Sequence, residues 1–321
     1  MEALELEVMD SFDAPVRLAV RDLLSHHEAA FGYAGLSEER QRVLDRTARH
    51  PGPDRLVAVA ARVTGSTELV GWAQVDGYGD GRTAVLELVT LPGPEAPAPS
   101  TALVDALADA ALAAFAARGD GPLRWWVGHA TDDDDDARAA RLGFVGDRDL
   151  LQLRCPLPLP VRRGGRPTPV VATRAFRVGE DEEAWLVQNN RAFAGHPEQG
   201  RWDLDTLLER QAEPWFDPDG FRVLEADGRI AGSCWTKVHR SARPALGEIY
   251  VIGVDPDYHG RGWGRALTED GFAWLADHGL AEGMLYVDAA NTAAVALYRS
   301  MGMTTHHVDR AYVTDSVAPT G

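Results

Sequence analysis

A glycine-rich loop follows an apolar segment that carries one carboxylate. The segment 247–254 is rich in β-branched residues, holds Glu248 as its only charge, and leads into Gly260-Arg-Gly-Trp-Gly264. Glycines let backbone amides approach a ligand closely, and a helix N-terminus attracts anions through its free N–H groups and its dipole. The loop is therefore predicted to bind a pyrophosphate, beside a strand on which Glu248 is placed to act as a base.

Two side chains suit acyl transfer from a thioester to an amine. A free α-amine has a pKa of roughly 7.7–8.0, so Glu248 is a sufficient base, either directly or through a water. A thiol has a pKa near ~8.5 and a tyrosine near ~10, so Tyr298 can protonate a departing thiolate. Backbone N–H groups around residues 252–254 are placed to polarise the thioester carbonyl. Cys234 is an alternative nucleophile, but it lies in a predicted strand with no apparent partner base.

The elements that must position these residues alternate between strand and helix. In the C-terminal half, strands are predicted over 170–178, 221–226, 230–239, 245–254, 284–287 and 304–313, and helices over 180–194, 203–213, 261–278 and 291–301. The N-terminal half repeats this order, with strands over 56–63, 69–77, 84–90, 123–127 and 150–156, a helix over 100–118 and a second that ends at 137–142. The fold class is therefore α/β with a mixed sheet, present as two tandem copies.

A linker separates the two copies. Residues 155–169 contain five prolines and two glycines, which is typical of an extended connection. We expect a degenerate domain over 1–154, the linker over 155–169 and a catalytic domain over 170–321. The N-terminal loop after Pro92 has neither Gly-x-Gly nor arginine, and Asp132–Asp136 is expected to be a solvated acidic loop that repels a polyanion. The N-terminal copy is thus predicted to be inactive and to bind coenzyme A poorly.

Composition excludes several classes of protein. The net charge of −17 over 321 residues argues against a nucleic-acid partner, although Arg261 and Arg265 supply a local positive site. The acidic N-terminus is no signal peptide, and no apolar run reaches the length of a membrane span, so a cytoplasmic protein is expected. Cys155 and Cys234 do not suggest a disulfide framework. Lys237 is the only lysine in the chain, which suggests a place where an ammonium cannot be replaced by a guanidinium.

The loop resembles the pyrophosphate loop of the GNAT superfamily of acyl-CoA-dependent N-acetyltransferases. The family pattern Gln/Arg-x-x-Gly-x-Gly/Ala falls on residues 259–264, with His259 at the first position. A glycine-rich turn without a ligand is the alternative, and Arg265 disfavours a Rossmann site, which needs glycine there. Segment 291–302 resembles the family's Asn…Tyr-x-x-x-Gly-Phe helix, which makes Tyr298 the general acid. The implied contacts with acetyl-CoA are Ile252, Gly253, Val254, His259, Gly260, Arg261, Gly262, Trp263, Gly264, Arg265, Asn291 and Ala294.

Further segments resemble the mycothiol synthase family, two-domain GNAT enzymes of actinobacteria. These are the His-Pro-Glu-Gln-Gly segment 196–200, Trp-Thr-Lys-Val-His at 235–239 and Leu-Tyr-Val-Asp at 285–288. The resemblance implies N-acetylation of the cysteinyl amine of cysteinyl-glucosaminyl-inositol by acetyl-CoA, with direct attack of the amine, Glu248 as base and Tyr298 as acid. It implies no metal, a small thiol pseudo-disaccharide as partner and a monomer. The implied substrate contacts are Glu38, Glu198, Lys237, Glu248 and Tyr286.

Two other functions stay open from the sequence. One is N-acetylation of another amine, on an aminoglycoside or a peptide. The other is a non-enzymatic sensor of acyl-CoA, against which the presence of both Glu248 and Tyr298 argues. The acceptor loop and the single lysine favour the pseudo-disaccharide over both alternatives.

Overall fold

The chain folds into two compact units. The computed structural model describes residues 3–11, 13–31, 33–49, 56–77, 83–92, 100–118, 121–128, 133–160, 167–195, 200–240 and 244–317. The first unit holds Met1–Leu150 and the C-terminal segment His307–Gly321, and the second holds Leu151–His306. The tandem division expected at residues 155–169 stays a prediction. No described helix has the length and apolar composition that a membrane span requires.

The first unit is a mixed sheet covered by helices. Its strands follow the order β1-β2-β3-β4-β5-β12, and only the β4–β5 pair is parallel among the pairs of this order that are described here. The elements are β1 (Leu4–Met9), α1 (Ala14–Phe31), α2 (Glu38–Arg49), β2 (Leu56–Val63), β3 (Leu69–Asp76), β4 (Ala84–Thr90), α3 (Thr101–Ala116), β5 (Leu123–Val127), α4 (Asp133–Arg141), the start of β6 (Val145–Pro156) and most of β12 (Thr304–Thr314).

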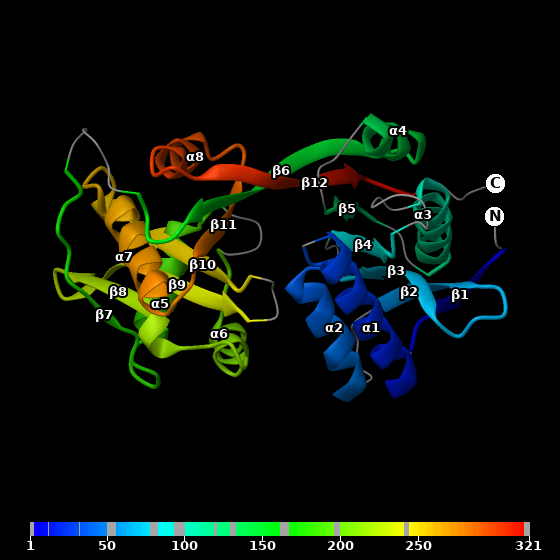
Figure 1. Cartoon of the computed structure of the whole chain (residues 1–321), viewed down its shortest axis with the longest axis horizontal. Coiled ribbons are helices and arrows are strands. Elements are labelled where there is room, and N and C mark those ends of the chain that lie inside the picture. Colours follow the sequence, from blue (N-terminus) through cyan, green and yellow to red (C-terminus); the bar gives the residue numbers. More distant parts are fainter. Residues whose placement is uncertain are drawn as a thin grey trace. The chain divides into compact units, whose positions relative to one another are not determined.

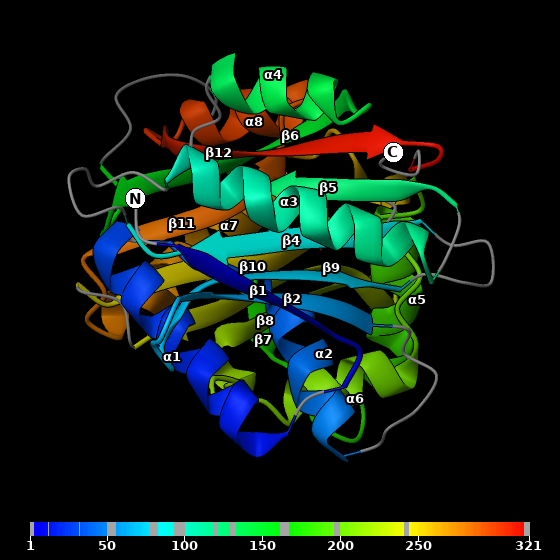
Figure 2. The same ribbon diagram turned by 90° about the vertical axis from the view of Figure 1, so that its right-hand side faces the viewer.

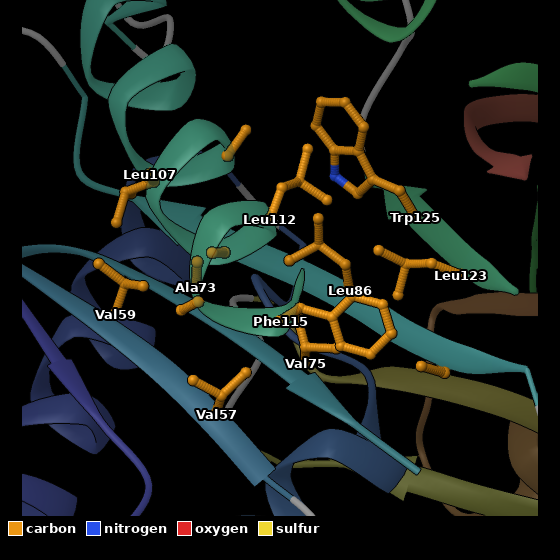
Figure 3. Close-up of a cluster of buried hydrophobic side chains, with 14 of the residues drawn as sticks. Val57, Val59, Ala73, Val75, Leu86, Leu107, Leu112, Phe115, Leu123 and Trp125 are labelled. Carbon is orange, nitrogen blue, oxygen red and sulfur yellow. The ribbon is translucent and has the colours of Figure 1, made fainter. Parts of the chain in front are cut away.

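Alternating side chains give this sheet two apolar faces. Val57, Val59 and Val75 pack with Leu107 and Phe115 of α3, and Figure 3 shows these side chains between the helix and the strands. The residues between them point to the other face, where α1 and α2 lie (Figure 2). A strand's side chains alternate between faces, so one strand stabilises both layers.

The second unit repeats this plan. Its sheet has the order β6-β11-β10-β9-β8-β7, and Figure 1 shows α7 lying along these strands. The elements are β7 (Thr173–Ala175), α5 (Glu182–Ala192), α6 (Leu204–Gln211), β8 (Phe221–Ala226), β9 (Arg229–His239), β10 (Leu246–Val254), α7 (Trp263–Asp277), β11 (Glu282–Asp288) and α8 (Thr292–Arg299), with short 3-10 turns at Pro218–Gly220 and Pro256–Tyr258. The predicted mixed α/β fold is confirmed.

The acidic run after residue 131 is not a solvated loop, and that expectation is wrong. Asp133–Arg141 forms α4, and Asp135 is buried with its carboxylate 2.6 Å from the Arg138 guanidinium. Asp136 accepts hydrogen bonds from Arg310 and Tyr312. Carboxylates in the first turn favour a helix N-terminus, and the arginines neutralise them. The proline-containing loop 93–99 lies outside the described residues.

A buried carboxylate lies at the centre of the first unit. Glu87 of β4 accepts hydrogen bonds from the backbone N–H and the hydroxyl of Ser37, at 2.6 and 2.7 Å. Burial raises the pKa of Glu87 to about 7, although Arg40 and the Ser37 hydrogen bonds act in the opposite direction. The nearby Arg40 guanidinium lies 3.1 Å from Asp76, so its charge is shared between two carboxylates.

We predict that Glu87 makes the first unit less stable as pH rises towards 8. Because the folded pKa is about 7 and the ordinary value is 4.5, its stabilising contribution is complete below pH 4.5 and is lost as pH rises through 7. The free energy of unfolding of the wild type relative to Glu87→Gln should therefore fall by about 2–3 kcal/mol between pH 5 and pH 8. Urea unfolding at four pH values measures it. The exposed Glu68→Gln is the control, and a difference independent of pH contradicts the prediction.

Candidate active site

The strands β10 and β11 run parallel for only three residue pairs. Their register joins Gly247, Glu248 and Ile249 to Gly283, Met284 and Leu285. In contrast, β10 stays paired with β9 as far as Val254. Among the described strand pairs, the register between β10 and β11 therefore ends at Ile249, and an extended ligand can pair with a strand edge of this kind. The predicted cofactor contacts Ile252, Gly253 and Val254 lie on this part of β10.

A β-bulge at Tyr250 changes which face of the sheet each side chain occupies. The β9–β10 register shifts between Ile249 and Val251. Ile249 packs in the cluster that includes α7, whereas Tyr250 and Val251 both pack on the face of α5 and α6. Bulges bend a strand and increase its local twist. The bulge thus lies at the residue that follows the last β10–β11 pair.

The glycine-rich loop has the backbone conformation of an anion site. Gly260 and Gly262 have φ angles of +77° and +81°, and Gly262 is the N-cap of α7. Left-handed residues in alternation with right-handed ones turn successive N–H groups towards one side, which forms a concave site for an anion. The first N–H groups of α7 also lack partners within the helix. His259, at the first motif position, hydrogen-bonds through Nε2 to the Val254 carbonyl at 3.0 Å.

A pocket of about 610 Å³ opens at this loop. Its lining includes Val254, Tyr258, residues 259–265, Ala293, Ala294, Leu297 and residues 167–169. Arg261 and Arg265 give the pocket its positive charge. The Arg261 guanidinium lies 4.9 Å from the Tyr258 ring centre and 5.2 Å from that of Trp263, so aromatic faces hold it beside the loop.

The remaining predicted cofactor contacts lie close to this pocket. Asn291 caps α8, since its side-chain oxygen accepts the Ala294 N–H at 3.1 Å. This capping fixes the start of the helix that carries Ala294 into the pocket wall. Ile252 and Gly253 do not line the pocket, and they lie just before Val254, which does. The glycine-rich loop, the pocket and the end of β10 at Val254 are therefore continuous with one another.

Glu248 is a buried carboxylate flanked by two basic side chains of β9. His239 Nε2 lies 2.6 Å from Glu248 Oε2, and Lys237 is the register partner of Glu248. Burial acts to raise the pKa of Glu248, but the hydrogen bond and charge of His239, together with Lys237, outweigh it and hold the pKa below its ordinary value. Glu248 is therefore ionised at neutral pH.

Lys237 is buried among aromatic rings. Its ammonium lies 4.6 Å from the Trp215 ring centre and 5.5 Å from that of Tyr250. Burial lowers the pKa of Lys237, and the charge of Glu248 partly opposes this. A compact ammonium fits over two ring faces, and it lies on the same face of the sheet as Glu248.

Tyr298 reaches the sheet from the other face. It is buried in the cluster formed with α7, next to Leu285, Ile249 and Cys234, and burial raises the pKa of its phenol. Because Ile249 points towards α7, its neighbour Glu248 points away from it. Glu248 and Tyr298 therefore approach the separated part of β10 and β11 from opposite faces. Cys234 is fully buried and burial raises the pKa of its thiol, which disfavours it as a nucleophile.

The predicted substrate contacts are only partly brought together. Tyr286 follows Met284 by two residues on β11 and so shares the face of Glu248; it is 38% exposed, and its hydroxyl accepts a hydrogen bond from Gln152 at 2.7 Å. Glu38 belongs to the first unit, where it opens α2 and lies 3.6 Å from Arg42. Glu198 lies outside the described residues. His239 was not predicted as a site residue.

Metal ligands were not expected at this site. Throughout the described ranges, no three His, Cys, Asp or Glu side chains come together in a group that could hold a metal ion.

Solved structures share the fold. A GCN5-related N-acetyltransferase from Sphaerobacter thermophilus superposes with a TM-score of 0.69 at 20% identity, covering 98% of this chain and 97% of that one. A tandem GNAT protein from the clavulanic acid biosynthesis pathway gives 0.64 at 17% identity, covering 99% and 100%. These similarities confirm the expected tandem GNAT architecture.

Curated relatives are considerably closer in sequence. The acetyltransferase (GNAT) family model matches residues 182–303. A mycothiol acetyltransferase from Geodermatophilus obscurus is 41% identical over 94% of this chain and 95% of its own length. One from a Parafrankia strain is 42% identical over 92% and 93%. Since such identity spans both units, the chain belongs to the mycothiol acetyltransferase family of GNAT enzymes.

Proposed function

We propose that this enzyme transfers the acetyl group of acetyl-CoA to the cysteinyl amine of cysteinyl-glucosaminyl-inositol, the last step of mycothiol biosynthesis. The observation that carries the proposal is the register of β10, which among the described pairs is matched to β11 only as far as the Ile249–Leu285 pair but continues beside β9 to Val254, just before the glycine-rich loop. One end of this part of β10 suits a pyrophosphate and the other lies at a buried base. The family of the relatives supports the same reaction.

Acetyl-CoA fits the second unit in three places. The amides at Gly260, Gly262 and the start of α7 would bind its pyrophosphate, with Arg261 and Arg265 adding charge. The edge of β10 beyond Ile249 would pair with the amide groups of pantetheine in the manner of an added strand. Its backbone N–H groups would also stabilise the oxyanion that forms at the thioester carbonyl.

Glu248 and Tyr298 would divide the proton transfers. The ionised Glu248 would accept a proton from the amine, directly or through a water, so that the neutral amine attacks the thioester carbon. The carbon–sulfur bond then breaks, and the phenol of Tyr298 would protonate the departing thiolate. The raised pKa of Tyr298 keeps its proton in place before that step. Entry from opposite faces keeps the base away from the leaving group.

The acceptor would lie on the face of α5 and α6. Lys237 offers three N–H donors to a polyhydroxylated ligand, and Tyr286 presents an exposed ring on the same face. Glu198 and Glu38 stay proposed contacts. We also propose a cytoplasmic location and a monomeric state.

The proposed acceptor is tested by a competition among amines. We expect purified protein with acetyl-CoA to acetylate cysteinyl-glucosaminyl-inositol at its cysteinyl amine, and to leave a peptide and an aminoglycoside in the same mixture unchanged. Mass spectrometry of the products measures this, because the acceptor's own thiol disturbs assays of thiol release. Acetylation of a different acceptor would show that the proposed substrate is wrong. Binding of acetyl-CoA without formation of any acetylated product would favour a non-enzymatic sensor of acyl-CoA.

The proposed anion site in the loop is tested by two glycine substitutions, which differ in how well the backbone and its surroundings tolerate an added Cβ. An added Cβ at Gly262 would be strained at φ +81° and would lie 3.1 Å from Pro169, whereas at Gly264 it would meet only Leu297 at 3.8 Å. We therefore expect Gly262→Ala to weaken acetyl-CoA binding at least about tenfold, a loss of ~1.4 kcal/mol. Gly264→Ala should stay within about threefold. Isothermal titration calorimetry measures both, and equal affinities would argue against an anion site in this loop.

The two catalytic assignments predict losses of similar size from conservative variants. Glu248→Gln and Tyr298→Phe should each lower kcat by roughly 10²–10⁴, the usual scale for general acid–base groups. Acetyl-CoA affinity should change little in either variant, because neither side chain lines the pocket at the loop. Stopped assays with quantified product measure kcat. Near-normal rates in both variants would remove the proposed roles.

A further inference from the structure

The two arginines that line the pocket at the loop differ in how far their charges are already used. The Arg265 side chain is only 13% exposed, and its Nη1 lies 3.7 Å from the Glu269 carboxylate. Its Nη2 donates a hydrogen bond to the hydroxyl of Ser300, the C-cap of α8. Glu269 also accepts a hydrogen bond from the Thr168 hydroxyl at 3.0 Å. Arg265 therefore joins α7 to the end of α8, and a carboxylate partly neutralises its charge.

Arg261, in contrast, is exposed and lies against aromatic rings. The rings of Tyr258 and Trp263 stack with their centres 5.1 Å apart and an angle of 21° between their planes. The Arg261 guanidinium lies 4.9 and 5.2 Å from these two centres. In the described part of the chain, no carboxylate forms an ion pair with it. A ring face attracts a cation without neutralising it, so Arg261 keeps its full positive charge.

Tyr258 fixes the position of these rings. It is 2% exposed, and its hydroxyl donates a hydrogen bond to the Asp227 carboxylate at 2.9 Å and accepts one from Arg229 Nε at 3.1 Å. Asp227 lies in the turn between β8 and β9, where its φ angle is +51°. The ring beside Arg261 is therefore held by the β8–β9 hairpin, independently of the glycine-rich loop.

The aromatic contacts leave the hydrogen-bond donors of Arg261 available. A guanidinium carries its five N–H groups in its own plane, and this fork matches two oxygens of a phosphate. Rings that contact the guanidinium do not accept these hydrogens as a carboxylate would. Because the rings already restrict the side chain, less of its freedom is lost when a ligand binds. Arg261 is thus prepared to bind a phosphate group.

Coenzyme A offers two kinds of phosphate. Its pyrophosphate suits the backbone N–H groups of the loop and the start of α7. Its ribose carries a separate 3′-phosphate, a monoester with about −1.5 to −2 charges at pH 7, which calls for a cation that is not already neutralised. We propose that Arg261 binds the 3′-phosphate and so selects the complete coenzyme, whereas Arg265 serves the pyrophosphate site. This inference rests on the proposed use of acetyl-CoA.

The test compares two acetyl donors that differ only in the 3′-phosphate. Isothermal titration calorimetry at one fixed ionic strength measures the binding of acetyl-CoA and of acetyl-dephospho-CoA. We expect the wild type to bind acetyl-CoA about tenfold more tightly, because the charge-assisted hydrogen bonds of Arg261 are lost with the phosphate. Arg261→Gln should weaken acetyl-CoA binding by about the same factor and leave acetyl-dephospho-CoA binding within about twofold of the wild type.

Two further arginine variants are the controls. Arg265→Gln should weaken the binding of both donors by a similar factor and so keep the preference of about tenfold, because both donors carry the pyrophosphate. The exposed Arg177→Gln removes the same charge from another part of the second unit and should bind both donors as the wild type does. Thermal unfolding should show that all variants are folded.

The outcomes separate this inference from the proposed function. Equal wild-type affinities for the two donors, or a full preference that persists in Arg261→Gln, overturn the role of Arg261 and leave acetyl-CoA as the donor. Loss of the preference in Arg265→Gln alone would assign the 3′-phosphate to that residue and also overturn the inference. If neither donor binds to the wild type, both the inference and the proposed use of acetyl-CoA are wrong.

Discussion

The early separation of β10 from β11 is the constraint on which the site depends. Three residue pairs hold the strands together, and the bulge at Tyr250 begins where that pairing ends. A sheet normally buries its hydrogen-bonding groups against neighbours. Among the described pairs, β10 keeps its β9 neighbour as far as Val254, whereas its register with β11 ends at Ile249. The fold thereby provides a backbone surface without any loop insertion.

The same bulge distributes side chains to the two faces of this opening. Ile249 remains with α7, while Tyr250 and Val251 both move to the side of α5 and α6. Gly253 then fits against α5, where an added Cβ would lie 3.1 Å from Ala192. The side chains of Tyr298 and Glu248 therefore lie on opposite faces of the sheet, with Tyr298 on the face that α7 covers. A regular strand would have shifted every later side chain to the opposite face.

The sequence predicts the fold for identifiable reasons, and it singles out the glycine-rich loop and Glu248 as site candidates. Strong apolar periodicity and the Asp227-Gly228 turn place β8 and β9, and the glycines place the start of α7. The missed elements are β1, α1 and α2. For α1 a signal existed, since Asp13 accepts the Val16 N–H and Pro15 follows, which is a capping pattern. The bulge has no signal of that kind, because it depends on packing against α5 and α6.

His239 was within reach of sequence reasoning. Residues 235, 237 and 239 of one strand must share a face, and Lys237 was already singled out. Only the register between β9 and β10 was lacking, and that register sets Lys237 against Glu248 and Leu246 against His239. The pairing of strands is a tertiary property. His239, two positions after Lys237, can therefore be identified from sequence as a neighbour of Glu248 only once β9 and β10 are aligned.

The two buried glutamates, Glu87 and Glu248, differ in the charged groups that surround them. Glu87 and Glu248 each lie on the strand that runs parallel to the next one, and each is opposed by a polar residue, Gln74 and Lys237 respectively. Burial penalises both charges. The two hydrogen-bond donors that Ser37 supplies to Glu87 are neutral, and burial raises the pKa of Glu87 to about 7. Glu248 instead has an imidazole and an ammonium beside it, and its pKa falls. The Arg40 charge near Glu87 is shared with Asp76 and does not outweigh burial, whereas His239 and Lys237 together do outweigh it at Glu248.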